Sequence, residues 1–282
     1  MISSENMPGP APKEIIESLN LACGKLGIDY FLIGARARDY WFEKFELSSR
    51  RFTRDVDFAV LVNSIDDFNK LLVLLEKEFS FKILKKIPHR VIWIKDDIIV
   101  DLIPFGNLAK AGYIHFEDKF DTVISVTGLK EAYEHSVLLK FNEKNLKLAS
   151  LPGISILKLI SWSAKPEDRS KDIVDIFNII EHYFEIESEN IYKYHLDIFD
   201  SKAFTTQKSG ARVLGREIAR LCETSGELKQ RLIEILSENI GNVDNPGKII
   251  QILTYQTDVD QADLFDLFNE LLRGSKEFRF DP

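Results

Sequence analysis

The chain has 282 residues, of which 45% are hydrophobic and 29% charged, and its formal net charge is −8. This composition is typical of a soluble globular protein, and the acidic balance argues against a protein that simply coats nucleic acid. Two distant cysteines, a polar start without a signal peptide and the lack of a long apolar run predict a cytoplasmic protein with no membrane contact.

The first half of the chain alternates between helical and strand patterns. In chain order, we expect a helix over 12–27, a strand at 30–33, a helix over 35–45, a strand at 56–62, a helix over 65–79, and strands at 81–87, 90–94 and 98–105. Asp96 and Asp97 are typical of the turn between the last two strands.

The pattern changes after about residue 126. A short helix at 128–136 and a hairpin at 137–148 are followed by predicted helices at about 153–164, 168–184, 189–199, 209–223, 226–240, 246–255 and 260–273. We therefore expect a mixed α/β domain over residues 1–126 and a helical domain over 127–282, with residues 127–151 as the junction.

Three aspartates lie on or beside predicted strands. Asp55 and Asp57 stand two residues apart at the start of an apolar strand, so their side chains should point to one face. Asp101 lies within an apolar strand, where an uncompensated carboxylate is unfavourable. Three carboxylates on neighbouring strands can hold one or two Mg²⁺ ions and align a hydroxyl with a phosphate. The alternatives are a loop cap or solvent-facing pair for the first two, and a salt bridge with Arg90 for Asp101.

The turn after the first strand is suited to binding phosphate. Gly34 and Ala35 are small, and the unpaired N–H groups at a helix start can donate to phosphate oxygens. Basic stretches at 36–54 and 82–95 add local positive charge, and the second contains no acidic residue. We expect this charge to attract a phosphate-bearing ligand. Ordinary solvated lysines are the alternative for residues 82–86.

Several motifs together point to a known family. They are Leu32-Ile-Gly34-Ala35-Arg-Ala-Arg38-Asp39, Arg51-x-Thr53-x-Asp55-x-Asp57-Phe, Val100-Asp101-Leu-Ile-Pro-Phe-Gly106, Leu151-Pro-Gly-x-x-x-Leu157-Lys158 and Arg169-x-Lys171-Asp172-x-x-Asp175. In this order they resemble the AbiEii/AbiGii-type nucleotidyltransferase family, part of the DNA polymerase β-like nucleotidyltransferase superfamily. The resemblance covers roughly residues 15–184. It implies an α/β (α+β) nucleotidyltransferase fold, in which a small mixed sheet flanked by helices precedes a mainly helical C-terminal domain.

The resemblance also implies roles for individual residues. Asp55 and Asp57 would bind the metal, and Asp101 would be a third ligand or the general base for an acceptor hydroxyl. The nucleotide-binding positions that it implies are Gly34, Ala35, Arg38, Thr53, Lys158, Arg169 and Asp172. Among these, Lys158 would pair with phosphate oxygens, and Asp172 would orient Lys158 or Arg169. Ala35 stands where the superfamily usually has serine or glycine, so the backbone amides must bind phosphate without help from a hydroxyl.

The implied reaction is transfer of a nucleoside monophosphate from an NTP to an acceptor hydroxyl, with Mg²⁺ or Mn²⁺ as cofactor. The acceptor can be RNA, including tRNA, a protein or a small molecule. The wider family includes toxins that act with a cognate antitoxin and phage-defence modules, so such a partner is one expectation. The alternatives are a non-catalytic nucleotide- or RNA-binding module and a toxin–antitoxin interaction protein on the same fold.

Other residues have simpler interpretations. Arg212, Arg216 and Arg220 recur every four residues, which favours a solvated helix face over a surface that steers RNA. Trp93 and Trp162 lie in apolar runs, so core packing is favoured over base stacking. Lys158 also fits a snorkelling lysine, and Arg169 with Asp172 fits a surface pair. The histidines show no metal-ligand spacing, so zinc is not expected.

Overall fold

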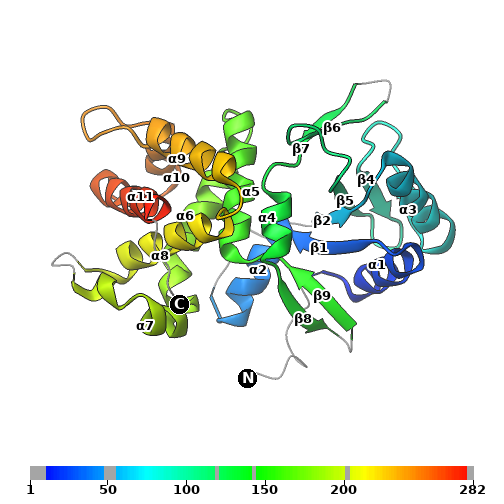
Figure 1. Cartoon of the computed structure of the whole chain (residues 1–282), viewed down its shortest axis with the longest axis horizontal. Coiled ribbons are helices and arrows are strands. Elements are labelled where there is room, and N and C mark those ends of the chain that lie inside the picture. Colours follow the sequence, from blue (N-terminus) through cyan, green and yellow to red (C-terminus); the bar gives the residue numbers. More distant parts are fainter. Residues whose placement is uncertain (1–10, 48–54, 118–120, 142–143, 201–203, 278–282) are drawn as a thin grey trace. The chain divides into compact units, whose positions relative to one another are not determined.

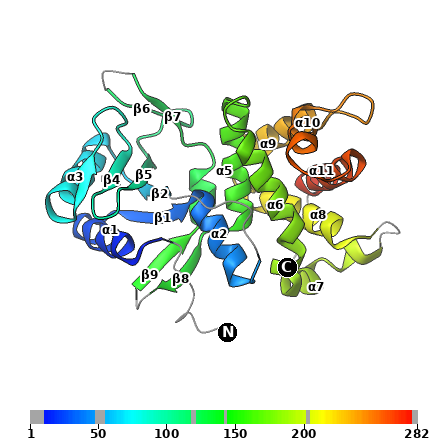
Figure 2. The same ribbon diagram turned by 180° about the vertical axis from the view of Figure 1, so that it is seen from behind.

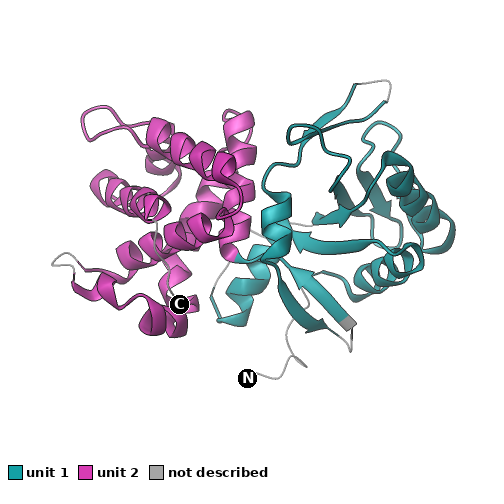
Figure 3. Cartoon of the chain, in the orientation of Figure 1, with its two compact units in different colours: residues 1–150 teal, residues 151–282 magenta. Residues whose placement is uncertain are grey.

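The computed structural model describes residues 11–47, 55–117, 121–141, 144–200 and 204–277 (Figure 1). The chain forms two compact units, residues 1–150 and 151–282 (Figure 3). The expected junction, 127–151, lies almost entirely in the first unit. The reason is that its hairpin extends the sheet of that unit instead of connecting two domains.

Within the described residues, seven strands of the first unit form one mixed sheet. Its order is β3 (Phe81–Ile83), β4 (Arg90–Trp93), β5 (Ile98–Phe105), β2 (Val56–Leu61), β1 (Asp29–Ile33), β9 (Lys144–Leu148) and β8 (Val137–Phe141). The β2–β5 and β1–β9 pairs are parallel, and the other neighbours are antiparallel. The fold class expected from the sequence, a mixed sheet with helices followed by a mainly helical half, is confirmed.

The helices of the first unit are α1 (Lys13–Leu26), α2 (Gly34–Lys44), α3 (Ile65–Glu78) and α4 (Leu129–Glu134). Helix α1 packs against α3, and the two lie side by side in both views (Figures 1 and 2). Helix α3 begins where Ser64 accepts a hydrogen bond of 3.1 Å from the Asp67 amide, a capping interaction that satisfies one unpaired N–H.

The two faces of the sheet differ in polarity. Tyr30, Phe58 and Leu102 are buried on the face towards α1, where the Tyr30 hydroxyl donates to the Ile16 carbonyl. The opposite face packs against α4 through contacts between the rings of Phe31, Phe105 and Tyr133. Because side chains alternate along each strand, Asp57 and Asp101 lie on this second face.

Two local predictions differ from the structure of this unit. The strand expected at 81–87 ends at Ile83, because Leu84, Ile87 and Arg90 are joined by backbone hydrogen bonds that form a turn. A two-stranded sheet of β6 (Tyr113–His115) and β7 (Val123–Ser125) was not predicted, since three-residue strands are too short to show a pattern.

The second unit is helical throughout its described residues. Its helices are α5 (Leu151–Ala164), α6 (Ser170–Ile186), α7 (Ser188–Tyr194), the short 3₁₀ helix η1 (Leu196–Asp200), α8 (Thr206–Leu221), α9 (Gly226–Ile240), α10 (Lys248–Gln256) and α11 (Gln261–Lys276). The single helix expected at 189–199 is interrupted at His195, whose buried ring lies 3.3 Å from the Arg216 guanidinium. No helix in the described ranges has the length and apolarity that a membrane span requires.

Candidate active site

Four neighbouring strands place the candidate residues in one row across the sheet. Asp57 on β2 pairs in register with Ile33 on one side and with Asp101 of β5 on the other. Asp101 in turn pairs with Arg90 of β4. Directly paired residues share a face, so Asp57, Asp101 and Arg90 form a charged row on the face opposite α1. Their neighbours in sequence, such as Val56 and Val100, fill the buried core on the other face.

The salt bridge between Arg90 and Asp101 dominates this row. Arg90 donates two hydrogen bonds to the Asp101 carboxylate, of 2.6 and 2.7 Å. The Arg90 pKa is raised, chiefly by the hydrogen bonds from its guanidinium to Asp101 and further by the charges of Asp101, Asp55 and Asp57. The guanidinium therefore lies in the combined electrostatic field of Asp101, Asp55 and Asp57. The alternative partner considered for Asp101 is thus its actual partner.

Gly34 lies beside Asp57, at the end of the row away from Arg90. Its φ of +70° is in the left-handed region, and a Cβ added here would lie 2.9 Å from the Asp57 Cγ and overlap the carboxylate. Helix α2 begins at this residue with no side-chain cap on its first N–H groups. The close approach of the turn to Asp57 explains why a residue without a side chain is required.

We expect Gly34→Ala to lower the free energy of unfolding by about 1–3 kcal/mol, because alanine at positive φ is strained and its Cβ displaces Asp57. Chemical denaturation of the two proteins measures the change. Gly24→Ala is the matched control: Gly24 lies inside α1 with nothing within 4 Å of an added Cβ, so this change should raise stability by about 0.5–1 kcal/mol. Equal effects of the two substitutions would contradict the assigned contact.

Asp55 precedes β2 by one residue, and Thr53, predicted to bind nucleotide, lies outside the described residues. Within the described ranges, no group of three or more Asp, Glu, His or Cys side chains is gathered as a metal site. Asp101 is instead held by Arg90. The oxygen donors of Asp55 and Asp57 still suit Mg²⁺, which commonly uses one or two carboxylates and completes its shell with water and substrate phosphate.

Arg38 is buried on helix α2. It is 1% exposed, and its Nε donates a hydrogen bond of 2.9 Å to the neighbouring Asp39, which is also buried. The nucleotide-binding role of Arg38 stays a prediction, and in this arrangement the guanidinium would have to leave its pair with Asp39 to approach a phosphate. Ala35 lies in the first turn of α2 next to Gly34, as expected.

The predicted residues of the second unit form a buried ion cluster. Lys158 Nζ lies 3.1 Å from Asp172 and 2.5 Å from Asp175, and Asp172 also accepts a 2.6 Å hydrogen bond from Arg169. The side chain of Lys158 is 10% exposed, as is that of Asp172. Asp172 therefore contacts both cations, as predicted, and Lys158 is neither snorkelling nor solvated. All four residues of the cluster belong to the second unit.

The arginine stripe of α8 is a network of ion pairs. Arg216, which is 9% exposed, bonds Asp197 at 2.8 Å and also pairs with Glu277, while Arg212 pairs with Glu277 at 2.5 Å. Arg220 pairs with Glu217 at 2.7 Å. The stripe is therefore neutralised by carboxylates, and its two inner arginines are largely buried, so it is not the solvated face that was favoured and offers little free charge to RNA.

Burial, and secondarily the charge of Arg216, lowers the pKa of His195 in this network to about 4. The unfolded chain has an ordinary histidine pKa near 6.5, so between about pH 6.5 and about pH 4 the unfolded state binds more protons. We expect stability to be full above that window and to fall as the pH falls through it, by on the order of 1–2 kcal/mol. Urea unfolding across the window tests this. His195→Asn should reduce the pH dependence, whereas the exposed His115→Asn should leave it unchanged.

Other candidate groups belong to the core. Trp93 and Trp162 are 3% and 0% exposed, which confirms core packing. Both cysteines are buried thiols, and burial raises the pKa of the Cys23 thiol to about 12. His89, which borders the charged row, has a buried Nδ1 without a hydrogen-bond partner, and burial lowers its pKa.

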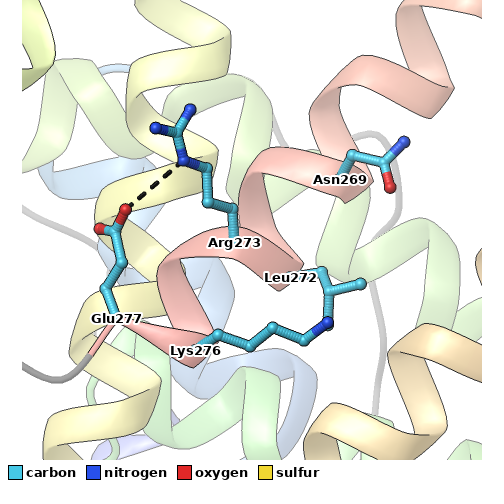
Figure 4. A pocket seen from close by; sticks show the side chains of 5 residues that line it. All are labelled: Asn269, Leu272, Arg273, Lys276 and Glu277. Carbon is cyan, nitrogen blue, oxygen red and sulfur yellow. Dashed lines mark ion pairs between the residues drawn. The ribbon is translucent and has the colours of Figure 1, made fainter.

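A hollow on the second unit is built from one helix. Figure 4 shows Asn269, Leu272, Arg273, Lys276 and Glu277 lining it along α11 and the residue after it, with Arg273 paired to Glu277. The hollow is shallow and its arginine is already neutralised, so it is a weaker ligand site than the charged row of the sheet.

No protein-family model and no curated protein matches the chain. Solved structures similar to it include the following two. An antigenic nucleotidyltransferase-like protein from Paracoccidioides brasiliensis is 18% identical, with 78% of this chain and 91% of that chain covered and a TM-score of 0.39. The solution structure of the antibiotic-resistance factor ANT(2'')-Ia is 10% identical, with 77% of this chain and 94% of that chain covered and the same TM-score.

Proposed function

We propose that the chain is a metal-dependent nucleotidyltransferase that moves an NMP from an NTP to an acceptor hydroxyl. The observation that carries this proposal is the pairing of Asp57 with Asp101 in register on adjacent parallel strands, beside the Gly34 turn. Two carboxylates this close repel each other, and a bound divalent cation would relieve that repulsion. The ordered motifs that resemble AbiEii/AbiGii-type nucleotidyltransferases support the same reading.

Asp55 and Asp57 would hold the metal ion, since their hard oxygens suit Mg²⁺ or Mn²⁺ better than softer metals. When bound, the ion would neutralise charge on the NTP phosphates. The first N–H groups of α2, at Gly34 and Ala35, have no side-chain cap. They can donate to triphosphate oxygens, an interaction that the helix dipole favours.

Asp101 is suited to act on the acceptor. In the reaction, the acceptor oxygen forms a bond to the α-phosphorus, the bond from that phosphorus to the bridging oxygen breaks, and pyrophosphate leaves. The hydroxyl proton passes to Asp101, whose carboxylate is held in orientation by the two hydrogen bonds from Arg90. Arg90 thus acts as a positioning residue that keeps this carboxylate fixed in the row.

Label transfer tests the function. The protein is incubated with each α-labelled NTP, Mg²⁺ and total tRNA, beside an Asp55→Ala/Asp57→Ala variant. Transfer of label to RNA by the parent chain and not by the variant supports the proposal, and identifies the donor. If the parent chain binds neither NTP nor Mn²⁺, the catalytic assignment of the aspartates is wrong.

A toxin–antitoxin role is the finer form of the same proposal. It requires that RNA modification stops growth of the host cell and that a partner protein relieves the arrest. Growth arrest that depends on Asp57 supports it, whereas arrest by an Asp57→Asn variant points to action by contact alone.

The salt bridge of Arg90 favours a second candidate, a non-catalytic nucleotide-binding module. Its guanidinium already supplies positive charge to Asp101, so the row is partly compensated without a metal ion. This candidate predicts NTP binding without release of pyrophosphate, and binding that persists in the presence of a chelator. The nucleotidyltransferase predicts the opposite on both counts.

A further inference from the structure

Strand β3 and the turn that joins it to β4 carry three exposed lysines. They are Lys82, Lys85 and Lys86, here called the lysine turn. None forms an ion pair or hydrogen bond with any residue that the structure describes. Backbone hydrogen bonds close the turn: the Ile87 amide donates to the Leu84 carbonyl at 3.1 Å, and the Arg90 amide donates to the Ile87 carbonyl at 3.0 Å. These bonds define the path of the backbone that carries Lys85 and Lys86.

The lysine turn adjoins the charged row. Lys82 pairs in register with Ile92, which lies two residues from Arg90 on the same strand. Alternation along β4 places Ile92 and Arg90 on one face, so Lys82 shares the face of Asp101 and Asp57. Lys85 and Lys86 lie in the connection that ends at Arg90. The three lysines thus lie next to the end of the row that holds the salt bridge between Arg90 and Asp101.

The surroundings leave this charge uncompensated. Some other lysines of the first unit do have carboxylate partners: Lys25 pairs with Glu78, Lys147 with Asp29 and Lys70 with Asp67. The acidic residue that contacts the strand of the lysine turn is Glu76, and its carboxylate accepts a 3.1 Å hydrogen bond from the Ile83 amide. In a chain with a net charge of −8, an unpaired positive cluster beside the candidate site attracts anions locally.

We propose that the lysine turn binds the sugar–phosphate backbone of a nucleic-acid acceptor and leads its terminal hydroxyl to Asp101. This inference rests on the proposed function and names the acceptor class. A nucleic-acid strand carries phosphates at regular intervals up to the nucleotide with the terminal hydroxyl, which matches a row of lysines that ends at the candidate base. The lysines contact phosphates and set the position of the strand, without selecting its sequence.

Binding of a labelled single-stranded RNA oligonucleotide, and of a DNA oligonucleotide of the same sequence, tests the proposal without NTP or metal. The variant Lys82→Gln/Lys85→Gln/Lys86→Gln should bind the RNA roughly tenfold more weakly or worse at low salt. The slope of log affinity against log salt concentration should become shallower by about 2, since each contact to a single strand contributes about 0.7. The matched control is Lys77→Gln/Lys110→Gln/Lys140→Gln, which removes the same charge from exposed positions elsewhere in the unit.

The outcomes are distinct. Weaker binding and a shallower slope in the first variant alone support the proposal, as does recovery with arginine at the same three positions. Equal losses in both variants would show that net charge alone governs binding and would overturn it, as would unchanged binding. Comparison of the two oligonucleotides tells RNA from DNA as the source of the backbone. An Asp57→Asn protein should bind RNA like the parent, so failure of catalysis and failure of the lysine turn are separable.

Discussion

Asp57→Asn is expected to fold like the parent chain and to reduce NMP transfer by about a hundredfold to a thousandfold. Asparagine keeps the shape of the side chain but removes its negative charge, which would bind the metal ion and which repels the charge of Asp101. Loss of one charge-stabilising group at a reaction centre has effects of this size. Stability should stay close to that of the parent chain, because the substitution relieves repulsion with Asp101 but also removes the charge that Asp57 presents to its own partners. Label transfer from an α-labelled NTP and thermal unfolding give the two readouts.

Asp96→Asn serves as the control for charge. Asp96 is exposed in the turn between β4 and β5, within the same unit. It should leave both transfer and stability within experimental error. If Asp57→Asn instead lowers stability and leaves transfer unchanged, the row is a structural feature and the catalytic proposal fails.

Lys158→Met should lower the free energy of unfolding by about 3–5 kcal/mol, because it leaves Asp172 and Asp175 buried without their shared cation. Urea unfolding measures the loss. Adding Asp175→Asn should recover part of it by removing one of the stranded charges. Lys171→Met, an exposed change on α6, the helix that carries Asp172 and Asp175, should stay within about 0.5 kcal/mol of the parent.

The Lys158→Met variant also tests the phosphate-binding role that the family resemblance implies for Lys158. A lysine held mainly for a ligand would tolerate methionine in the unliganded protein and would show its effect as weaker NTP binding. A large loss of stability with unchanged NTP affinity of the remaining folded protein would assign the residue to the ion cluster alone.

The sequence was sufficient to predict the elements that carry the site. Period-two and helical patterns located β1, β2, β4, β5 and most helices to within a few residues, because each buries one regular apolar face. The neighbouring positions of Asp57 and Asp101 followed from their places in two apolar strands. The turn predicted at Asp96 and Asp97 also determines which residues of β4 and β5 lie opposite each other. In that register Arg90 pairs with Asp101.

Features that depend on distant contacts were not predictable. Nothing in the local pattern around Arg38 distinguishes a buried ion pair from a ligand-binding arginine, since both use the same residues on the same helix. The pairing of Glu277 with Arg212 and Arg216 joins residues more than sixty positions apart. Such pairs are fixed by how helices pack, which a pattern of apolar residues does not specify.

The parallel pairing of β1 with β9 has a consequence for synthesis on the ribosome. Phe31 pairs with Lys147, so the central strand that leads into Gly34 leaves the ribosome long before its neighbour does. At about 5–20 residues per second, that edge of the nascent sheet stays open for several seconds. An open edge invites pairing with other chains, so a nascent chain that stalls before residue 144 would be especially prone to aggregate.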